Sequence, residues 1–265
     1  MKQKILSALS DAYPWKEQLH YFPTIDSTND HIRLLARSGA PHGTVVIAGH
    51  QSNGHGRRGR CFHSPEGVGI YLSILLRPQC LPQELMHLTC ATAVAMCDAV
   101  EAATGLRPGI KWTNDLVYGK RKLGGILTEL GFTSRGALDY AIIGIGINCC
   151  QTEADFPEDI RKMAGSLAMV TGKEIDRSRV AAAMIDALYQ MDTKLLTHKA
   201  NILRAYRRDC ITLGQDIVLV RGEEKRYGTA LDIDEDGALL VRFSDGHEEI
   251  VNSGEVSVRG MYGYI

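Results

Sequence analysis

The sequence lacks an excess of charge of either sign, because 30 lysines and arginines are balanced by 31 aspartates and glutamates in 265 residues. The formal net charge of −1 excludes a protein whose whole surface attracts nucleic acid or an anionic membrane. Any cationic site must therefore be local, which makes the positions of the arginines informative. A nucleic-acid-binding protein that uses one basic segment is the alternative that this balance leaves open.

Long apolar runs, paired cysteines and metal-binding motifs are also missing. The N-terminus lacks the apolar core of a signal peptide, and no run approaches the roughly 18 apolar residues of a membrane span. We therefore expect a cytoplasmic protein with no membrane partner. The seven cysteines form no C-x-x-C pair, which predicts reduced, inert thiols, with a catalytic cysteine as the less favoured alternative. The nine histidines show no metal-ligand spacing, so no metal site built from a protein motif is predicted.

What is present is the composition of a soluble globular protein, with 45% hydrophobic and 23% charged residues. The length suits one large domain with a small companion. Hydrophobic periodicity predicts helices over residues 1–14, 32–39, 82–104 and 179–206. Strands are expected at 20–22, 44–48, 69–76, 110–112, 116–118, 125–130 and 140–147.

The pattern changes after Leu213 and Gly214. Short alternating strands are expected at 217–220, 227–233, 239–243 and 249–251, separated by turns rich in aspartate and glycine. About fifty residues are too few for a sandwich and suit a small barrel. We therefore divide the chain into residues 1–211 and a small all-β module of residues 212–265.

The most unusual stretch is the segment Gly-His-Gly-Arg-Arg-Gly-Arg at residues 54–60, which we call the basic loop. It has the form of a dinucleotide fingerprint, but no helix is expected after it, so that interpretation is rejected. Glycine amides can wrap an anion, and guanidinium groups suit phosphate or carboxylate oxygens. We expect the loop to be mobile when empty and to become ordered on an anionic ligand. A solvated basic loop without a ligand is the alternative.

Two further segments carry polar groups beside a strand end or paired glycines. Residues 111–116 deliver the amide of Asn114 and the carboxylate of Asp115, although this pair is also common in β-turns. Lys122 precedes two glycines, where an ammonium group can meet an anion that the backbone also approaches closely. A basic hairpin rim is the alternative for that segment.

Two weaker candidates complete the pattern. Residues 26–29 suit a helix N-cap, and the hydroxyls of Ser27 and Thr28 could instead face a pocket. Residues 144–148 place small residues on a strand with an asparagine at its end.

Together and in order, these segments resemble those of the biotin protein ligases over about residues 20–265. The matching segments are 26–29, Gln51, 54–60, 111–116, 122–127, 144–148, 237–240 and 253–256. The resemblance implies an α+β fold of the class II synthetase type, with a central mixed sheet and flanking helices. An SH3-like barrel is implied to follow it. The closest rival is a lipoate ligase of the same broad fold, which the basic loop and the C-terminal module disfavour.

The resemblance also implies an ATP-dependent ligase. Biotin is activated as biotinyl-5′-AMP with release of pyrophosphate, and is then transferred to a lysine of a biotin carboxyl carrier protein. ATP and Mg²⁺ are the implied cofactors, and a homodimer is plausible for the family. Some members carry an N-terminal DNA-binding domain, but only about fifteen residues precede the pattern here, so no DNA binding is expected.

By resemblance, the catalytic residues are Lys122, Arg57 and Asp115, with Asp115 either holding Mg²⁺ or orienting the incoming amine. The implied biotin-binding residues are Ser27, Thr28, Asn29, Gln51, His55, Gly56, Arg57, Lys122, Gly124 and Gly125. The implied ATP- and adenylate-binding residues are Arg57, Arg58, Arg60, Phe62, Asn114 and Asn148.

Three positions depart from the usual pattern of that family. His55 stands where arginine is usual, Phe62 replaces a tryptophan, and Thr113 replaces a proline. If His55 acts through its backbone amide, little changes, whereas a role for the side chain would alter affinity or pH dependence. We interpret these departures as tuning of the site.

Overall fold

The structure is a computed structural model and describes residues 1–252 and 255–258. Its centre is a seven-stranded sheet in the order β1-β2-β3-β7-β6-β5-β4. The strands are β1 (Leu19–Ile25), β2 (Val45–Gln51), β3 (Gly69–Leu76), β4 (Gly109–Lys111), β5 (Asp115–Tyr118), β6 (Arg121–Phe132) and β7 (Leu138–Asn148). β1 and β2 run parallel and the remaining neighbours pair antiparallel, so the sheet is mixed, as the resemblance implied.

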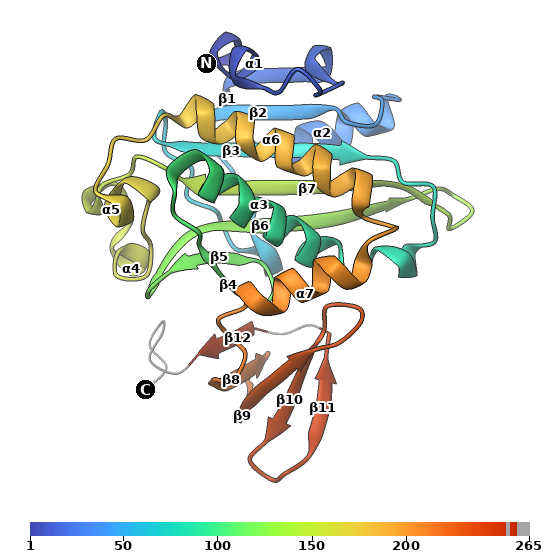
Figure 1. Ribbon diagram of the computed structural model, residues 1–265, viewed down its shortest axis with the longest axis vertical. Helices are drawn as coiled ribbons and strands as arrows, with labels where there is room; N and C mark the ends of the chain where they lie inside the picture. Colours follow the sequence, from blue (N-terminus) through green and yellow to red (C-terminus); the bar gives the residue numbers. More distant parts are fainter. Residues whose placement is uncertain (253–254, 259–265) are drawn as a thin grey trace.

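Helices cover both faces of this sheet (Figure 1). The α-helices are α1 (Lys2–Ala8), α2 (Thr28–Arg37), α3 (Leu88–Thr104), α4 (Glu158–Arg161), α5 (Leu167–Thr171), α6 (Arg177–Lys194) and α7 (Lys199–Asp209). Short 3-10 turns occupy η1 (Lys16–Gln18), η2 (Arg57–Gly59), η3 (Pro82–Leu85) and η4 (Glu153–Asp155).

Successive residues of each central strand serve opposite faces of the sheet. Val45 and Ile47 join the large core that contains α3 and α6, whereas Val46 between them packs with Ile32 of α2. This alternation follows from the period of two in an extended strand. Because both faces are covered, the central strands read as almost continuous apolar runs in the sequence.

Two predicted helices have different bounds in the structure. The helix expected over 82–104 begins as the 3-10 turn η3 and becomes α-helical at Leu88. The helix expected over 179–206 is two helices, because the helical conformation is interrupted between Lys194 and Lys199. Leu195, in this interruption, is buried, and its carbonyl accepts a hydrogen bond from His87 Nε2. The apolar spacing of the sequence therefore continues through residues that are not helical.

The N-terminal helix is also shorter than expected, since α1 ends at Ala8 and not near Pro14. The helical stretch Pro82–Thr104 is long and apolar enough to cross a membrane by composition. However, 72% of its most apolar part is buried inside the molecule, where α3 packs against α6. We therefore describe it as the core helix of the fold.

The C-terminal part is a five-stranded antiparallel sheet in the order β11-β10-β9-β8-β12. Its strands are β8 (Asp216–Arg221), β9 (Glu224–Ile233), β10 (Leu239–Phe243), β11 (Glu248–Val251) and β12 (Glu255–Val258). Sequence patterning predicted the first four and missed β12, which pairs with β8. Residues 253–254 of the segment matched to the family, and residues 259–265 of the module, lie outside the described residues.

The small sheet joins the large domain through buried hydrogen bonds around Trp112. The Trp112 amide donates to Thr212 Oγ1 at 2.9 Å, and its indole nitrogen donates to the Gly237 carbonyl at 3.0 Å. One residue earlier, the Ile211 amide donates to the Ile110 carbonyl at 2.9 Å. The residues next to β4 are therefore held partly by the C-terminal module.

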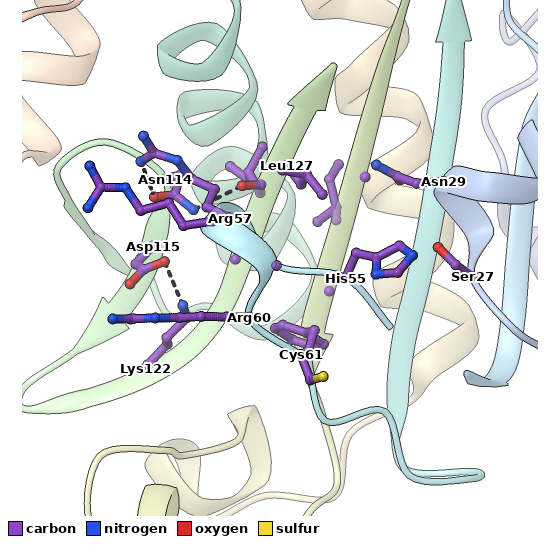
Figure 2. A pocket seen from close by; sticks show the side chains of 18 of the residues that line it. Ser27, Asn29, His55, Arg57, Arg60, Cys61, Asn114, Asp115, Lys122 and Leu127 are labelled. Carbon is purple, nitrogen blue, oxygen red and sulfur yellow. Dashed lines mark hydrogen bonds and ion pairs between the residues drawn. The ribbon is translucent and has the colours of Figure 1, made fainter. Parts of the chain in front are cut away.

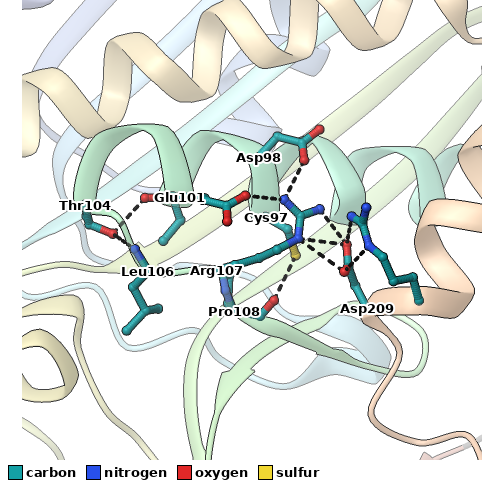
Figure 3. A network of polar contacts seen from close by, with 10 residues as sticks. Cys97, Asp98, Glu101, Thr104, Leu106, Arg107, Pro108 and Asp209 are labelled. Carbon is teal, nitrogen blue, oxygen red and sulfur yellow. Dashed lines mark hydrogen bonds and ion pairs between the residues drawn. The ribbon is translucent and has the colours of Figure 1, made fainter.

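An arginine cluster secures the chain just before this joint (Figure 3). Arg107 pairs with Asp98 and Glu101 of α3 and with Asp209 at the end of α7. Burial alone would raise the pKa of Asp209, but hydrogen bonds from Arg208 and Arg107 hold it below its ordinary value. The carboxylate is thus kept charged although its side chain is only 6% exposed.

Candidate active site

A cavity of about 170 Å³ lies where α2 begins, β2 ends and the basic loop crosses β6 and β7. It gathers most of the residues that the sequence implicated. The described lining residues are Ser27, Thr28, Asn29, Gln51, His55, Gly56, Arg57, Arg58, Arg60, Cys61, Phe62, Lys111, Trp112, Asn114, Asp115, Lys122, Gly125, Ile126, Leu127, Gly144, Ile145, Gly146 and Val256.

The cavity has two chemically different sides (Figure 2). Ser27 and Asn29 lie on one side, whereas Asp115 and Lys122 lie on the other, with Arg57 and Arg60 near them. The first side offers neutral hydrogen-bonding groups. The second offers cations and one carboxylate, so the two ends of a bound molecule would meet different chemistry.

The neutral side is built from the first turn of α2 and the end of β2. Ser27 is the N-cap of α2, accepting from the Asp30 amide at 3.4 Å, and it also lines the cavity. Thr28 donates from both its amide and its hydroxyl to Gln51 Oε1, at 2.9 and 3.0 Å. The two sequence interpretations of this segment, helix cap and pocket wall, therefore both hold.

The basic loop folds back on itself as a small hairpin. The Gly56 amide donates to the Arg60 carbonyl at 2.7 Å, and the Phe62 amide donates to the Gly54 carbonyl at 2.8 Å. Arg58 has a φ of 58°, in the left-handed region, which lets the turn reverse within η2. Arg57, Arg58 and Arg60 of the loop all line the cavity.

Arg57 joins the loop to the segment after β4. Its Nη1 donates to Thr113 Oγ1 and to Asn114 Oδ1, both at 2.9 Å. Burial and the neighbouring Arg58 lower the pKa of Arg57, although Asp115 opposes this shift. A guanidinium stays protonated at neutral pH, and both of these acceptors are neutral, so its charge can act on an anionic ligand.

Lys122 and Asp115 form an ion pair across β5 and β6, with Nζ 2.6 Å from Oδ1. Gly125 lies beside them, and a Cβ there would come 3.5 Å from Lys122 Nζ, which is ordinary contact. The absence of a side chain at Gly125 leaves open the space next to the ammonium. Asn114 is fixed nearby, because its Nδ2 donates to the Ile126 carbonyl at 2.9 Å.

Two residues implicated by the sequence do not line the described cavity. Gly124 packs inside the sheet, where a Cβ would come 2.5 Å from the Gly146 carbonyl oxygen. Asn148 donates to the Gly165 carbonyl and accepts from Gln151 Nε2, so its amide holds the segment that follows β7. In the structure Gly124 allows two strands to pack closely, and the Asn148 amide makes hydrogen bonds within the chain.

The residue sets drawn from the sequence omit two glycines of β7 that shape the cavity. A Cβ on Gly144 would lie 2.1 Å from Asn29 Oδ1, and one on Gly146 would lie 2.4 Å from the Phe62 ring. The alternation Gly-Ile-Gly-Ile was the available signal, because it places both glycines on one face of a strand. Val256 of β12 also lines the cavity, and its strand gave no clear pattern.

Comparison with known proteins identifies the family. The biotin/lipoate A/B protein ligase family matches residues 21–148, and the biotin protein ligase C terminal domain matches residues 212–259. The chain is 34% identical over 238 residues to the bifunctional ligase/repressor BirA of Bacillus spizizenii, covering 89% of this chain and 73% of that protein. The chain belongs to the biotin protein ligase family.

Two further relatives span both chains more fully. The biotin–[acetyl-CoA-carboxylase] ligase of Mycobacterium tuberculosis is 31% identical, over 91% of this chain and 89% of that one. The biotin protein ligase from Aquifex aeolicus in complex with biotin and ATP has 31% identity and a TM-score of 0.76, over 91% of this chain and 98% of that one. The expected fold and the expected activity of an ATP-dependent biotin ligase are thereby confirmed.

Proposed function

We propose that the cavity under the basic loop holds biotin and ATP together, with biotin spanning its two sides. The polarity of the cavity carries this proposal. Biotin has a neutral ureido ring at one end and a carboxylate at the other, which matches neutral groups on the side of Ser27 and Asn29 and cations on the side of Lys122. The relative from Aquifex aeolicus that binds biotin and ATP supports this assignment.

On the neutral side, Ser27, Thr28, Asn29 and Gln51 would hydrogen-bond the ureido group, joined by the backbone at His55 and Gly56. A bound ligand must form hydrogen bonds with the polar groups that it buries, and an amide-like ring can do so through both its oxygen and its nitrogens. The fatty-acid-like tail would then run past Gly125 and the apolar side chains of Ile126 and Leu127. Gly124 would contribute by keeping the sheet compact behind the tail.

On the cationic side, the first step joins two anions and therefore needs charge compensation. An oxygen of the biotin carboxylate attacks the α-phosphorus of ATP, forming a P–O bond while the bond to pyrophosphate breaks. Lys122 would contact the carboxylate and the α-phosphate, and Arg57 would contact the phosphates. Arg58 and Arg60 would close over the nucleotide, Phe62 would stack on the adenine, and Asn114 would bind the nucleotide.

In the second step, the amine of a carrier lysine attacks the acyl carbon, and the bond between that carbon and the AMP oxygen breaks. Asp115 would orient the amine by accepting a hydrogen bond from it. Mg²⁺ would enter with ATP and neutralise phosphate charge, held mainly by phosphate oxygens, with Asp115 as the carboxylate that the described lining offers. Across the described residues, no cluster of three metal-binding side chains occurs.

The acceptor we propose is a biotin carboxyl carrier domain, in line with the biotin–[acetyl-CoA-carboxylase] ligases among the relatives. We also propose that residues 1–211 form the catalytic domain and residues 212–265 the C-terminal module. A homodimer, a cytoplasmic location and the absence of DNA binding stay predictions. Analytical ultracentrifugation, with biotin and with duplex DNA added separately, tests the first and the last.

Pyrophosphate release tests the proposed function directly. With ATP and Mg²⁺, we expect biotin to stimulate release, lipoate to have little effect, and an added carrier domain to become biotinylated on one lysine. Release with lipoate but not with biotin would identify the rival lipoate ligase. Absence of turnover with either acid would refute the proposal.

A further inference from the structure

His55, which departs from the arginine usual in the family, contacts the first turn of α2. Its Nε2 lies 2.7 Å from Asp30 Oδ2, with the two side chains 35% and 32% exposed. Figure 2 shows the His55 ring turned toward the side of the cavity where Ser27 and Asn29 lie. The contact spans 25 positions in sequence and attaches the start of the basic loop to a helix.

Asp30 in turn belongs to a chain of charged contacts. Arg33 pairs with the second oxygen of Asp30 and, through Nη2, with Glu129 Oε1 at 2.7 Å. The other oxygen of Glu129 accepts from Asn29 Nδ2 at 2.7 Å. His55 is thus connected through three charged side chains to an asparagine on the cavity wall. Hydrogen bonds from His55 and Arg33 hold the pKa of Asp30 below its ordinary value against the opposing effect of burial.

The same asparagine begins a second path that returns to the loop. Ser73 Oγ lies within hydrogen-bond distance of Asn29 Oδ1, at 2.5 Å, and of Thr28 Oγ1, at 2.8 Å. From Thr28 the path continues through Gln51 Oε1 and Nε2 to Ser64 Oγ at 3.0 Å. The Ser64 hydroxyl donates to the Phe62 carbonyl at 2.9 Å. Because the Phe62 amide donates to the Gly54 carbonyl, this path closes into a ring at the start of the basic loop, next to His55.

We propose that Asp30 is a positioning residue that, through His55, holds the basic loop in its ligand-binding position at the neutral side of the cavity. This inference rests on the proposed function, in which biotin binds beneath that loop. The cationic side does not depend on the same contact, because Arg57 is held by Thr113 and Asn114, and Lys122 by Asp115. Loss of Asp30 should therefore weaken biotin binding far more than it slows the chemical step.

A double-mutant cycle on Asp30 and His55 tests this coupling in the full-length enzyme. The KM for biotin and the kcat of pyrophosphate release are measured for Asp30→Ala, His55→Ala and the double variant. If the pair acts as a unit, each single change should raise the biotin KM by about 3–10-fold, as expected for one lost hydrogen bond, with no further increase in the double variant. The kcat should change by less than about twofold.

The conservative variant His55→Arg provides a rescue. Its guanidinium can donate to the same carboxylate, so it should recover most of the biotin affinity lost in His55→Ala, but only while Asp30 is present. His31→Ala is the matched control, because His31 is the next residue on α2 and packs against the Phe22 ring at 4.6 Å between centroids. Its biotin KM should match that of the wild type.

Asp30 also lies in the first turn of α2, where a carboxylate stabilises a helix, so thermal unfolding of every variant is recorded. His55 lies outside α2, so His55→Ala keeps the test decisive if Asp30→Ala folds poorly. Independent, additive increases in KM, or a fall in kcat as large as the rise in KM, would overturn the inference. A wild-type enzyme inactive with biotin would instead overturn the proposed function.

Discussion

At the scale of single residues, the pairing of Lys122 with Asp115 holds an ammonium group where it can contact an anionic ligand. Nζ of Lys122 lies 2.6 Å from Asp115 Oδ1, yet the lysine side chain is 36% exposed. A partly solvated pair of this kind contributes little to stability, so the ammonium can exchange its partner without a large cost. We therefore expect the Lys122 ammonium to act by binding carboxylate and phosphate oxygens of the ligands.

Replacing Lys122 with alanine should therefore separate activity from folding. By analogy with a lost oxyanion contact, we expect adenylate formation to slow by roughly 10²–10³-fold, with almost no change in thermal stability. Lys120→Ala is the matched control, because Lys120 is exposed at the same turn and does not line the cavity. Pyrophosphate release in single-turnover conditions measures the rate. Full activity in Lys122→Ala would show that another group contacts the carboxylate.

Asp209 leads to a prediction about acid stability. Its pKa is lower in the folded protein than in the unfolded chain, so its contribution to stability is complete above the unfolded value of about 3.9 and is lost as pH falls through the folded value. Asp209→Asn should lower the unfolding free energy at neutral pH by about 2–3 kcal/mol. Urea unfolding between pH 7 and about pH 3 should then show a flatter decline for the variant. Parallel curves for the two proteins would contradict this.

At the scale of elements, the basic loop and β7 both line the cavity. Phe62, two residues beyond the basic loop, packs against Gly146, so the segment that follows the loop lies on a strand that has no side chain at that position. A ligand in the cavity would add contacts to both the loop and the strand and slow their separation.

Limited proteolysis provides the measurement for that closure. We expect a protease specific for arginine to cleave within residues 54–64 several-fold more slowly when biotin and ATP are present together, because opening of the loop must then break ligand contacts. Cleavage elsewhere in the chain serves as the internal control. Equal rates with and without ligands would mean that the loop does not close over them.

Elements were predictable from the sequence where local pattern and packing agree. β3 was predicted with its observed ends, since every residue from Gly69 to Leu76 is buried, a second glycine, Gly67, lies two positions before it, and Arg77 follows it. The break between α6 and α7 was not predictable, because Leu195 keeps the apolar spacing through it. The ring of contacts through Glu129 was equally hidden, since it joins residues a hundred positions apart.

At the scale of the whole molecule, the C-terminal module contacts the wall of the cavity through Gly237. Its φ of +87° favours glycine, and a Cβ there would come 2.6 Å from Cys90 Sγ in the core of the large domain. The carbonyl of the same residue accepts from the indole of Trp112, which lines the cavity. The turn at Gly237 therefore packs against Cys90 and Trp112 of the large domain and fixes the position of the module there.

Substitution of this glycine should affect stability and activity together. Gly237→Ala adds backbone strain and a collision with Cys90, and we expect a loss of about 2–4 kcal/mol in unfolding free energy with weaker pyrophosphate release. Gly246→Ala is the matched control, since Gly246 has a φ of +85° and nothing within 4 Å of its Cβ position. That variant should show the strain alone, about 1–2 kcal/mol, and normal activity. Equal effects of the two changes would argue against a functional joint.

The strand order of the large sheet also dictates when the enzyme can become active during its synthesis. β3 pairs along its whole length with β7, although β4, β5 and β6 come between them in the chain. A nascent chain on the ribosome must therefore keep the edge of β3 open until Asn148 has emerged, and long-range pairing of this kind is slow. Until then the apolar strand is a template on which other nascent chains can pair, so synthesis that stalls before β7 would favour aggregation.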